Sequence, residues 1–456
     1  MSTTNPSSPP PAPAGGTTTF LDGNFEPVSE EVTAFDLPVT GTIPAELTGR
    51  LLRIGPNPVT PPDPATYHWF VGNGMVHGLR LRDGRAEWYR NRFVRDREVT
   101  AALGGEPLPG DRDGDGTVNT HVIGHAGRTF ALVEAGSRPI ELSYELGSVA
   151  RCDFDGTLDG GLSAHTKLDP VTGDLHTVTY HWAWDHIRHV VIGPDGRVRR
   201  ELHVPVADGP MVHDCAITED HVVLFDLPVT FSLDDAMAGR RLPYRWNPDH
   251  PARVGLLPLD GSADDVVWYD APECYVFHPL NAYGLDDGGV VVDLVRHPCM
   301  FDTRLNGPGE GDPVLERWTL PAGGSAVRAQ QLDDLPQEFP RHDERLTGRR
   351  HRYGYGAVVR EPFVHGPIVK HDLDAGTRQV HDFGPGRMSL EPVFVPRAAD
   401  AAEDDGWLLS YVYDAGTGLS DVVILAAQDV AGDPVATVHL PVRVPFGFHG
   451  SWVPDR

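Results

Sequence analysis

The stretch Gly78-Leu79-Arg80-Leu81-Arg82-Asp83-Gly84-Arg85-Ala86-Glu87-Trp88-Tyr89 predicts a tight β-hairpin. Its central Asp-Gly pair supplies the positive φ angles that a primed two-residue turn requires, and strand-like runs flank it on both sides. The same turn chemistry recurs along the whole chain. We expect further hairpins around Pro194-Asp195-Gly196, Thr218-Glu219-Asp220, Asp286-Asp287-Gly288-Gly289, Asp374-Ala375-Gly376 and Ala415-Gly416-Thr417-Gly418.

Recurring hairpins without a composition break predict an all-β chain, and 50 Gly and 42 Pro in 456 residues fit a chain that turns often. No apolar stripe at helical spacing extends over three turns. We therefore expect one closed repeat architecture such as a β-propeller, covering 20–456 as a single domain, with a pair of β-sandwiches as the alternative. Residues 1–19 are rich in Ser, Thr and Pro and are expected to form a disordered arm.

The formal net charge is −27, which argues against nucleic acid and against electrostatic adhesion to anionic lipid, because both require clustered Lys and Arg. No apolar run reaches the roughly 18 residues that a transmembrane helix needs. Four scattered cysteines without CxxC spacing, and the absence of a basic-then-apolar leader, favour a reducing, cytoplasmic location.

Four longer segments interrupt the hairpins: 95–117, 227–251, 298–313 and 331–355. In a compact β protein such connections tend to form caps or lids, so we expect them on one face as a dome over a site. The first contains Asp111-Arg112-Asp113-Gly114-Asp115-Gly116, which matches the start of a calcium loop. The match fails at the twelfth position, Val122, where a bidentate glutamate is required.

Four histidines with small or turn-forming neighbours recur at wide intervals, at His165, His213, His278 and His449. Only a closed ring whose inner strands converge on an axis would bring such distant residues together. Neutral imidazole suits Fe, Zn, Cu and Ni, so a convergence of four would create a metal site. The spacing alone is a weak signal, because 18 other histidines compete among the 22 in the chain.

Eight blocks in consistent order strengthen the hypothesis, because from about Phe35 to Arg456 the chain resembles the carotenoid cleavage oxygenases. The blocks are Gly49-Arg50-Leu51-Leu52-Arg53-Ile54-Gly55-Pro56-Asn57-Pro58, His68-Trp69-Phe70 through Gly74-Met75-Val76-His77-Gly78, Ala131-Leu132-Val133-Glu134-Ala135-Gly136, Ser163-Ala164-His165, Val212-His213-Asp214, Glu338-Phe339-Pro340-Arg341, Glu391-Pro392-Val393-Phe394 and Phe448-His449-Gly450.

The resemblance implies a seven-bladed β-propeller with a dome of loops and short helices over an axial metal site. It implies one non-haem Fe(II) per chain, held by His165, His213, His278 and His449. It also implies that Glu134, Glu338 and Glu391 accept hydrogen bonds from the outer ring nitrogens of His213, His278 and His449, respectively. A carboxylate in that position fixes the imidazole tautomer and makes the ring a better donor to the metal.

The reaction implied by the resemblance is cleavage of a carbon-carbon double bond by dioxygen to give two carbonyl fragments. Four protein ligands on an iron that prefers six leave two positions open, enough for dioxygen and a water. The family divides between polyene and hydroxylated stilbene substrates. Stilbene cleavers carry a lysine directly before the first glutamate and a tyrosine in the strand that corresponds to 89–94; in this chain those positions are Val133 and Phe93, neither of which polarises a phenol.

We therefore expect an apolar carotenoid or apocarotenoid substrate, with Val133 and Phe93 as substrate-pocket candidates and stilbenoid cleavage as the alternative. A polyene is delivered from a membrane, so we also expect an apolar mouth on the dome and peripheral membrane contact there. Candidate residues for the mouth lie in 101–103 and 227–231. The hypothesis of a different class is a propeller that acts as a binding scaffold without a metal.

Overall fold

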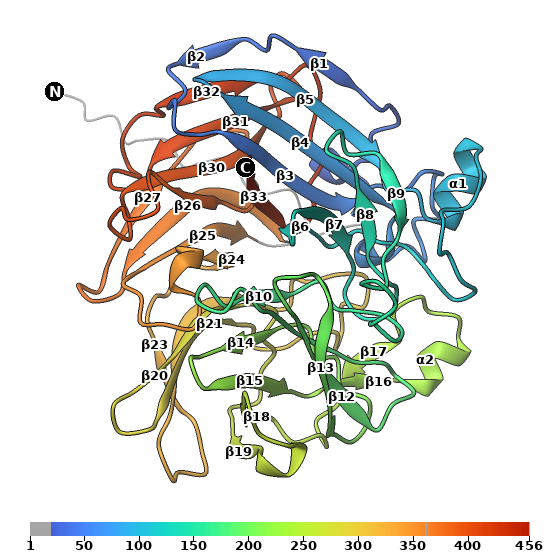
Figure 1. Cartoon of the computed structure of the whole chain (residues 1–456), viewed down its shortest axis with the longest axis vertical. Helices are drawn as coiled ribbons and strands as arrows, with labels where there is room; N and C mark the ends of the chain where they lie inside the picture. The colour runs from blue at the N-terminus through green and yellow to red at the C-terminus, as the bar shows by residue number, and fades with distance from the viewer. Residues whose placement is uncertain (1–19, 361–362, 456) are drawn as a thin grey trace, which may run out of the picture.

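The computed structural model describes residues 20–360 and 363–455, so the arm expected at 1–19 lies outside the described residues. Within these ranges the chain forms seven antiparallel sheets of four or more strands and one two-stranded ribbon (Figure 1). Neighbouring sheets contact one another in a ring that closes on itself. The fold is the predicted seven-bladed β-propeller, and its sheets are the blades.

Antiparallel pairing joins the strands of each blade. Blade one contains β1 (Thr33–Phe35), β5 (Arg85–Phe93), β4 (Gly74–Arg82), β3 (Gly49–Pro56) and β33 (Gly450–Pro454). Blade two contains β6 (His121–His125), β7 (Arg128–Leu132), β8 (Ile140–Leu142) and β9 (Ser148–Arg151). Blade three contains β10 (Thr166–Leu168), β11 (Leu175–Thr179), β12 (His186–Ile192) and β13 (Val198–Pro205). Blade four contains β14 (Cys215–Ile217), β15 (His221–Asp226), β18 (Arg253–Pro258) and β19 (Val267–Asp270).

The other blades follow the same plan. Blade five contains β20 (Pro279–Gly284), β21 (Val290–Arg296), β22 (Val314–Leu320) and β23 (Arg328–Gln331). Blade six contains β24 (Gln337–Arg341), β25 (Tyr353–Arg360), β26 (Val364–Asp372) and β27 (Thr377–His381). Blade seven contains β2 (Val39–Gly41), β32 (Ala436–His439), β31 (Leu419–Ala426) and β30 (Gly406–Asp414), with β28 (Arg387–Ser389) and β29 (Val393–Pro396) both paired to β30.

The predicted hairpins lie where the turn chemistry placed them. Asp83 and Gly84, with φ angles of 50° and 71°, connect β4 to β5. The other predicted turns connect β12 to β13, β14 to β15, β20 to β21, β26 to β27 and β30 to β31. Each turn therefore fixes the register of two adjacent strands within one blade.

Both ends of the chain close the ring. The C-terminal strand β33 pairs with β3 in blade one, and the N-terminal strand β2 pairs with β32 in blade seven. The approach of β33 is close, because a Cβ atom at Gly450 would lie 2.3 Å from the carbonyl oxygen of Leu52. Glycine at this position allows the strand that follows His449 to reach the ring.

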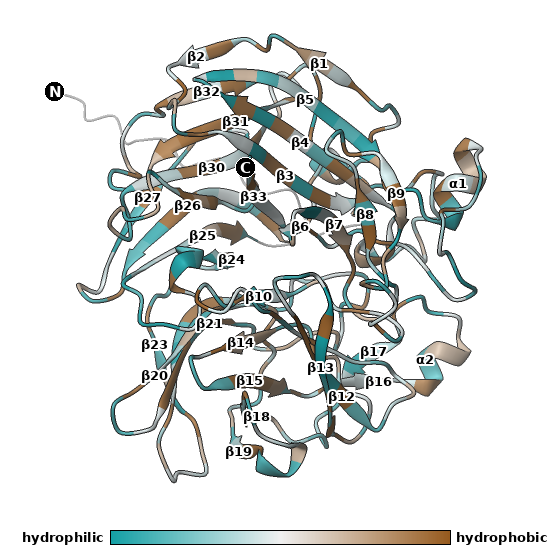
Figure 2. Ribbon diagram, in the orientation of Figure 1, coloured by the Kyte–Doolittle hydropathy of each residue, from teal (hydrophilic) through white to brown (hydrophobic). Residues whose placement is uncertain are grey.

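Apolar side chains concentrate on the inner and middle strands of the blades. Every residue of β3 is buried, and in β21 only the final Arg296 is not fully buried. The outer strand β23 is fully exposed, and β27 is exposed except at its last residue. Figure 2 shows the same gradient, with hydrophobic residues along the strands and hydrophilic residues in many outer loops. The core therefore lies between the blades, as expected for sheets buried on both faces.

The dome gathers on one side of the molecule, on the right in Figure 1. It includes α1 (Arg97–Leu103), α2 (Leu233–Met237) and the ribbon of β16 (Val229–Phe231) and β17 (Tyr244–Trp246). The prediction was wrong for part of the fourth long segment, since 337–341 forms β24, the inner strand of blade six. No helix in the described ranges is long and apolar enough to cross a bilayer.

Candidate metal centre

Four histidines converge on one point, and each lies one or two residues before the first strand of a blade or before the closing strand. His165 precedes β10, His213 precedes β14, His278 precedes β20 and His449 precedes β33. The ring centroid of His165 lies 4.4 Å from that of His213, 5.1 Å from that of His278 and 4.8 Å from that of His449. The structure therefore brings together four residues that are far apart in sequence.

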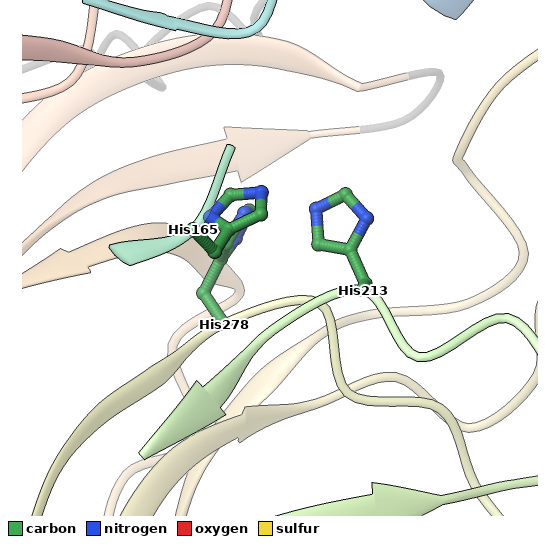
Figure 3. A group of neighbouring side chains, drawn as sticks. All are labelled: His165, His213 and His278. Atoms are coloured by element: carbon green, nitrogen blue, oxygen red, sulfur yellow. The ribbon is translucent and has the colours of Figure 1, made fainter. Parts of the chain in front are cut away.

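The geometry fits a metal ion. One ring nitrogen each of His165, His213 and His278 lies within 4.8 Å of the others, and the three side chains point toward a common centre (Figure 3). The Nε2 atoms of His165 and His278 are buried without a hydrogen-bond partner among the described residues. An unsatisfied buried nitrogen costs about 1 to 3 kcal/mol, so two at one point favour a bound cation as their partner. Burial, together with the neighbouring His213, lowers the pKa of His165 well below its ordinary value, which keeps the ring neutral as a metal ligand requires.

Three glutamates lie behind three of the histidines. The Nδ1 atom of His278 donates to Glu338 Oε2 at 2.6 Å, and His449 Nδ1 donates to Glu391 Oε1 at 2.9 Å. The Nδ1 atom of His213 lies 2.7 Å from Glu134 Oε2. Hydrogen bonds through Nδ1 leave the Nε2 atoms of His278 and His449 to face the centre, whereas the contact of His213 with Glu134 lies outside hydrogen-bond geometry.

The second oxygen of each glutamate has a different partner, which sequence reasoning missed. Tyr180 donates its hydroxyl to Glu134 Oε1 at 2.6 Å, and His297 Nε2 lies 2.8 Å from Glu338 Oε1. The Glu391 carboxylate receives the backbone N–H of Gly450 at 2.8 Å and lies 3.2 Å from Arg341 Nη1. Arg341 and Gly450 belong to quoted family blocks, whereas no sequence signal marked Tyr180 or His297.

These contacts keep two of the carboxylates ionised. Burial would raise the pKa of Glu338, but His278 and His297 hold it well below its usual range. Burial acts in the same way on the pKa of Glu391, which Arg341 and His449 hold well below its usual range. Ionised carboxylates therefore lie behind two of the imidazoles, where they would compensate the charge of a bound cation.

His165 has no glutamate behind it. Its Nδ1 atom lies 3.8 Å from Asp214 Oδ2, beyond hydrogen-bond distance. The same carboxylate oxygen accepts from Lys167 Nζ at 2.8 Å, and Asp214 Oδ1 accepts from the backbone N–H of Cys215. Three of the four histidines therefore contact a glutamate through the outer ring nitrogen, and His165 does not.

An apolar cavity of about 610 Å³ opens beside the histidines on the dome side. His213, His278 and His449 form part of its floor. Its other walls are largely aromatic and come from Trp69, Phe70, Tyr180, Trp182, Phe231, Tyr244, Phe277, Phe339, Phe363 and Phe448. Such a lining suits a hydrophobic molecule that lies against the histidine cluster.

Of the two residues predicted to line the substrate pocket, the structure places only one in the cavity. Val133 lines the cavity. Phe93 does not line the cavity, because its side chain packs with Met75 and Val99 in a separate buried cluster. Strand alternation explains the correction: at the end of β5, one residue of register decides which face of the blade a side chain occupies.

The long segments contribute unequally to the cavity. Thr117, Phe231 and Pro308, from the first three segments, are among its lining residues, as are Glu338 and Phe339 from β24. Leu103 on α1 is exposed and does not line the cavity, whereas Leu227 and Val229 are buried in the core. The aspartates of the calcium-like stretch are paired with arginines: Asp111 with Arg97 and Arg151, Asp113 with Arg97, and Asp115 with Arg138.

The chain matches a known family model over almost its whole length. The model is described as "Retinal pigment epithelial membrane protein", and it matches residues 25–454. A curated carotenoid cleavage oxygenase from Mycobacterium tuberculosis is 46% identical over 95% of this chain and 97% of its own length. The chain belongs to the carotenoid cleavage oxygenase family. It is therefore an oxygenase, and its family is iron-dependent.

Other similar proteins include a monooxygenase and a dioxygenase with different names, and one solved structure contains cobalt. An isoeugenol monooxygenase from Pseudomonas nitroreducens is 31% identical over 95% of this chain and 98% of its own length. The crystal structure of a lignostilbene dioxygenase from Pseudomonas brassicacearum superposes with a TM-score of 0.88 at 29% identity, covering 96% of this chain and 99% of that one. A cobalt-substituted oxygenase from Synechocystis superposes with a TM-score of 0.83 at 28% identity, covering 94% of this chain and 97% of that one.

Proposed function

We propose that this oxygenase is a non-haem Fe(II) dioxygenase that cleaves a carbon-carbon double bond of a carotenoid or apocarotenoid to give aldehyde or ketone products. The observation that carries the proposal is the position of the histidine cluster at the floor of a cavity of about 610 Å³ with aromatic walls. A polyene fits such walls, and one of its double bonds would then lie over the histidines.

His165, His213, His278 and His449 are the proposed metal ligands, each through Nε2. Iron(II), when bound there, supplies the activation of dioxygen against an electron-rich double bond. The glutamates hold the imidazole rings in orientation, and the aromatic walls bind the polyene and exclude water from it. Among the cavity-lining carboxylates, Glu134 and Glu338 are occupied by His213, Tyr180, His278 and His297, so neither is free for acid-base catalysis.

The choice of a polyene over a phenol rests on Val133. An aliphatic side chain at this position offers no partner to a phenolic hydroxyl, and a polyene needs none. A hydroxylated stilbene is the second candidate because two tyrosines, Tyr180 and Tyr244, line the cavity. The hydroxyl of Tyr180 is engaged by Glu134, which leaves Tyr244 as the hydroxyl able to meet a polar substrate.

Incubation with ¹⁸O₂ separates the two candidates. Fe(II)-loaded protein is given an apocarotenoid or a hydroxylated stilbene under the same conditions, and the carbonyl products are measured by mass spectrometry. We expect labelled aldehyde from the polyene and at most a small fraction of that rate from the stilbene. Preferential cleavage of the stilbene would replace the polyene proposal, and the labelling of one or both fragments would show whether one or both oxygen atoms are incorporated.

We also propose that α2 touches a lipid surface when substrate is taken up. Leu233 and Met237 on α2 are 62% and 80% exposed, and Trp182 beside the same cavity is 52% exposed. The large negative net charge makes electrostatic attraction unfavourable, so contact would be apolar and insensitive to salt. Leu233→Asp with Met237→Asp is expected to abolish sedimentation with phosphatidylcholine vesicles, whereas Val171→Asp, at a similarly exposed valine elsewhere, should leave it intact.

The domain boundaries are likewise a proposal. We infer that 20–456 acts as one oxygenase domain, a view supported by the way β2 and β33 close the ring from opposite ends of the chain. A protein that begins at residue 20 should bind the same amount of iron as the full chain. A loss of iron on removal of 1–19 would show that the arm belongs to the domain.

A further inference from the structure

A second cavity, of about 400 Å³, lies on the other side of the histidine cluster. We call it the axial channel. His278, His449 and Phe339 line both the apolar cavity and the axial channel, whereas His213 lines only the first and His165 only the second. The histidine cluster therefore forms the partition between two spaces of different character.

The axial channel connects the cluster to the surface. At its outer end Leu168 is 42% exposed, and the Glu344 side chain is 62% exposed. At its inner end Asp214 and Glu391 are buried beside His165 and His449. Carboxylates thus stand at both ends of one passage.

The axial channel has a mixed lining, in which charged and polar groups lie among apolar residues such as Leu175, Leu280 and Trp452, and it is more polar than the lining of the apolar cavity. Lys167 is neutralised by Asp214 at 2.8 Å, and Arg341 is shared by Glu344 at 2.5 Å and Glu391 at 3.2 Å. Three carboxylates therefore face two cations. Neutral oxygen and nitrogen groups lie between them, among them His121, whose Nε2 atom lies 3.2 Å from the Ser451 hydroxyl.

The apolar cavity has the opposite character. Apolar side chains form most of its walls, and Arg240 and Arg241 lie among its exposed residues. A hydrated divalent cation that entered there would meet this positive charge and would then pass walls that are mostly apolar, where few groups are able to replace its water. In the axial channel, carboxylate, hydroxyl and imidazole groups are able to replace that water stepwise.

We propose that the axial channel is the route by which a hydrated divalent metal ion reaches the four-histidine site, separate from the cavity through which substrate enters. The inference rests on the proposed metal site and adds a function to a part of the molecule that takes no part in binding the polyene. It predicts that obstruction of the channel slows metal uptake without changing the amount of metal bound at the end.

Two exposed leucines offer a matched test, since Leu168 lines the axial channel and Leu233 lines the apolar cavity. Apoprotein prepared with a chelator is mixed with cobalt(II), and uptake is followed by the visible absorbance of the bound ion. Leu168→Trp is expected to slow uptake about fivefold or more, and Glu344→Gln about two- to fivefold with a weaker dependence on ionic strength. Leu233→Trp should take up cobalt at the wild-type rate. Circular dichroism of each apoprotein establishes that the fold is retained.

The possible results distinguish a failure of the proposed entry route from a failure of the proposed metal site. Equal uptake rates in all four proteins, or slower uptake only in Leu233→Trp, would overturn the route while the metal site stands. A folded wild-type apoprotein that takes up no cobalt, although protein refolded with cobalt holds one ion per chain, would also overturn it. Absence of bound cobalt under every condition would refute the metal site itself, and the route with it.

Discussion

Glu391 binds two consecutive residues of the C-terminal tail through its two oxygens. Its Oε1 atom accepts from His449 Nδ1 at 2.9 Å, and its Oε2 atom accepts from the backbone N–H of Gly450 at 2.8 Å. One carboxylate thus orients the imidazole and holds the first residue of the closing strand β33. A proposed metal ligand and the strand that closes the ring therefore share this contact.

Replacement of Glu391 by Gln is therefore expected to weaken metal affinity about 10- to 100-fold, because the amide neither fixes the imidazole tautomer nor supplies charge. The measurement is cobalt(II) affinity by competition with a chelator. Glu316→Gln is the matched control, since Glu316 is also buried and accepts from an arginine, Arg296, but contacts none of the four histidines. An equal loss of affinity in both variants would show that the effect is general destabilisation.

Deletion of the last ten residues, 447–456, removes His449 together with β33. We expect this protein to lose iron and to unfold at a lower temperature, because β3 loses one of its two partner strands. His449→Ala separates the two effects: iron should be lost while the thermal midpoint of the apoprotein changes little. Full iron retention by the shortened protein would show that another histidine completes the site.

Tyr180→Phe removes one hydroxyl and leaves the shape of the cavity unchanged. Because that hydroxyl donates to Glu134 at 2.6 Å, its loss should let the carboxylate shift away from His213 and weaken cobalt(II) affinity about two- to tenfold. Tyr275→Phe is the control, since the Tyr275 hydroxyl is also buried and donates to the carbonyl of Met211. Unchanged affinity in Tyr180→Phe would show that Glu134 is held by His213 alone.

The dome segment 227–251 is anchored by a histidine between two carboxylates. His250 Nδ1 lies 2.9 Å from Asp208 Oδ2, and Nε2 lies 2.8 Å from Asp226 Oδ1, whose second oxygen accepts from Arg253. Burial lowers the pKa of His250, but the hydrogen bonds to Asp226 and Asp208 outweigh it and raise the pKa above its ordinary value. The folded state therefore binds this proton more tightly than the unfolded state does.

The resulting stabilisation is fully present below about pH 6.5 and is lost as the pH rises through the folded-state pKa. The difference in free energy of unfolding between wild type and His250→Gln should accordingly shrink from about pH 6 to about pH 9, as measured by urea denaturation at each pH. His189→Gln serves as control, because burial lowers the pKa of His189 to about 3. The difference in free energy of unfolding between wild type and His189→Gln should therefore not change with pH above about pH 7. If the difference in free energy of unfolding between wild type and His250→Gln were also independent of pH, His250 would not anchor the dome segment through a protonated ring.

Local turn chemistry made much of the fold predictable. Asp83-Gly84 and its counterparts set hairpins that are visible in the sequence, because positive φ angles restrict the residues that fit. The closure of the ring is different: β2 pairs with β32 and β33 with β3 across almost the whole chain, and no local pattern encodes such pairings.

The candidate site also combines residues that the sequence predicts with residues that only the fold brings together. The histidines and glutamates stand in recognisable blocks, whereas Tyr180 and His297 meet their glutamates only through the fold. The prediction for Phe93 was wrong because a strand position alone does not decide which face of the blade a side chain occupies. The axial channel is formed by inner strands of several blades, so only the structure brings its residues together.

The central claim is that His165, His213, His278 and His449 together hold one iron ion. Its most direct test is the iron content of anaerobically purified protein after Fe(II) loading, compared with His278→Ala. The account predicts about one iron per chain in the wild type and essentially none in the variant. Less than about one-third of an iron per chain in the loaded wild type, or equal iron in both proteins, would contradict it.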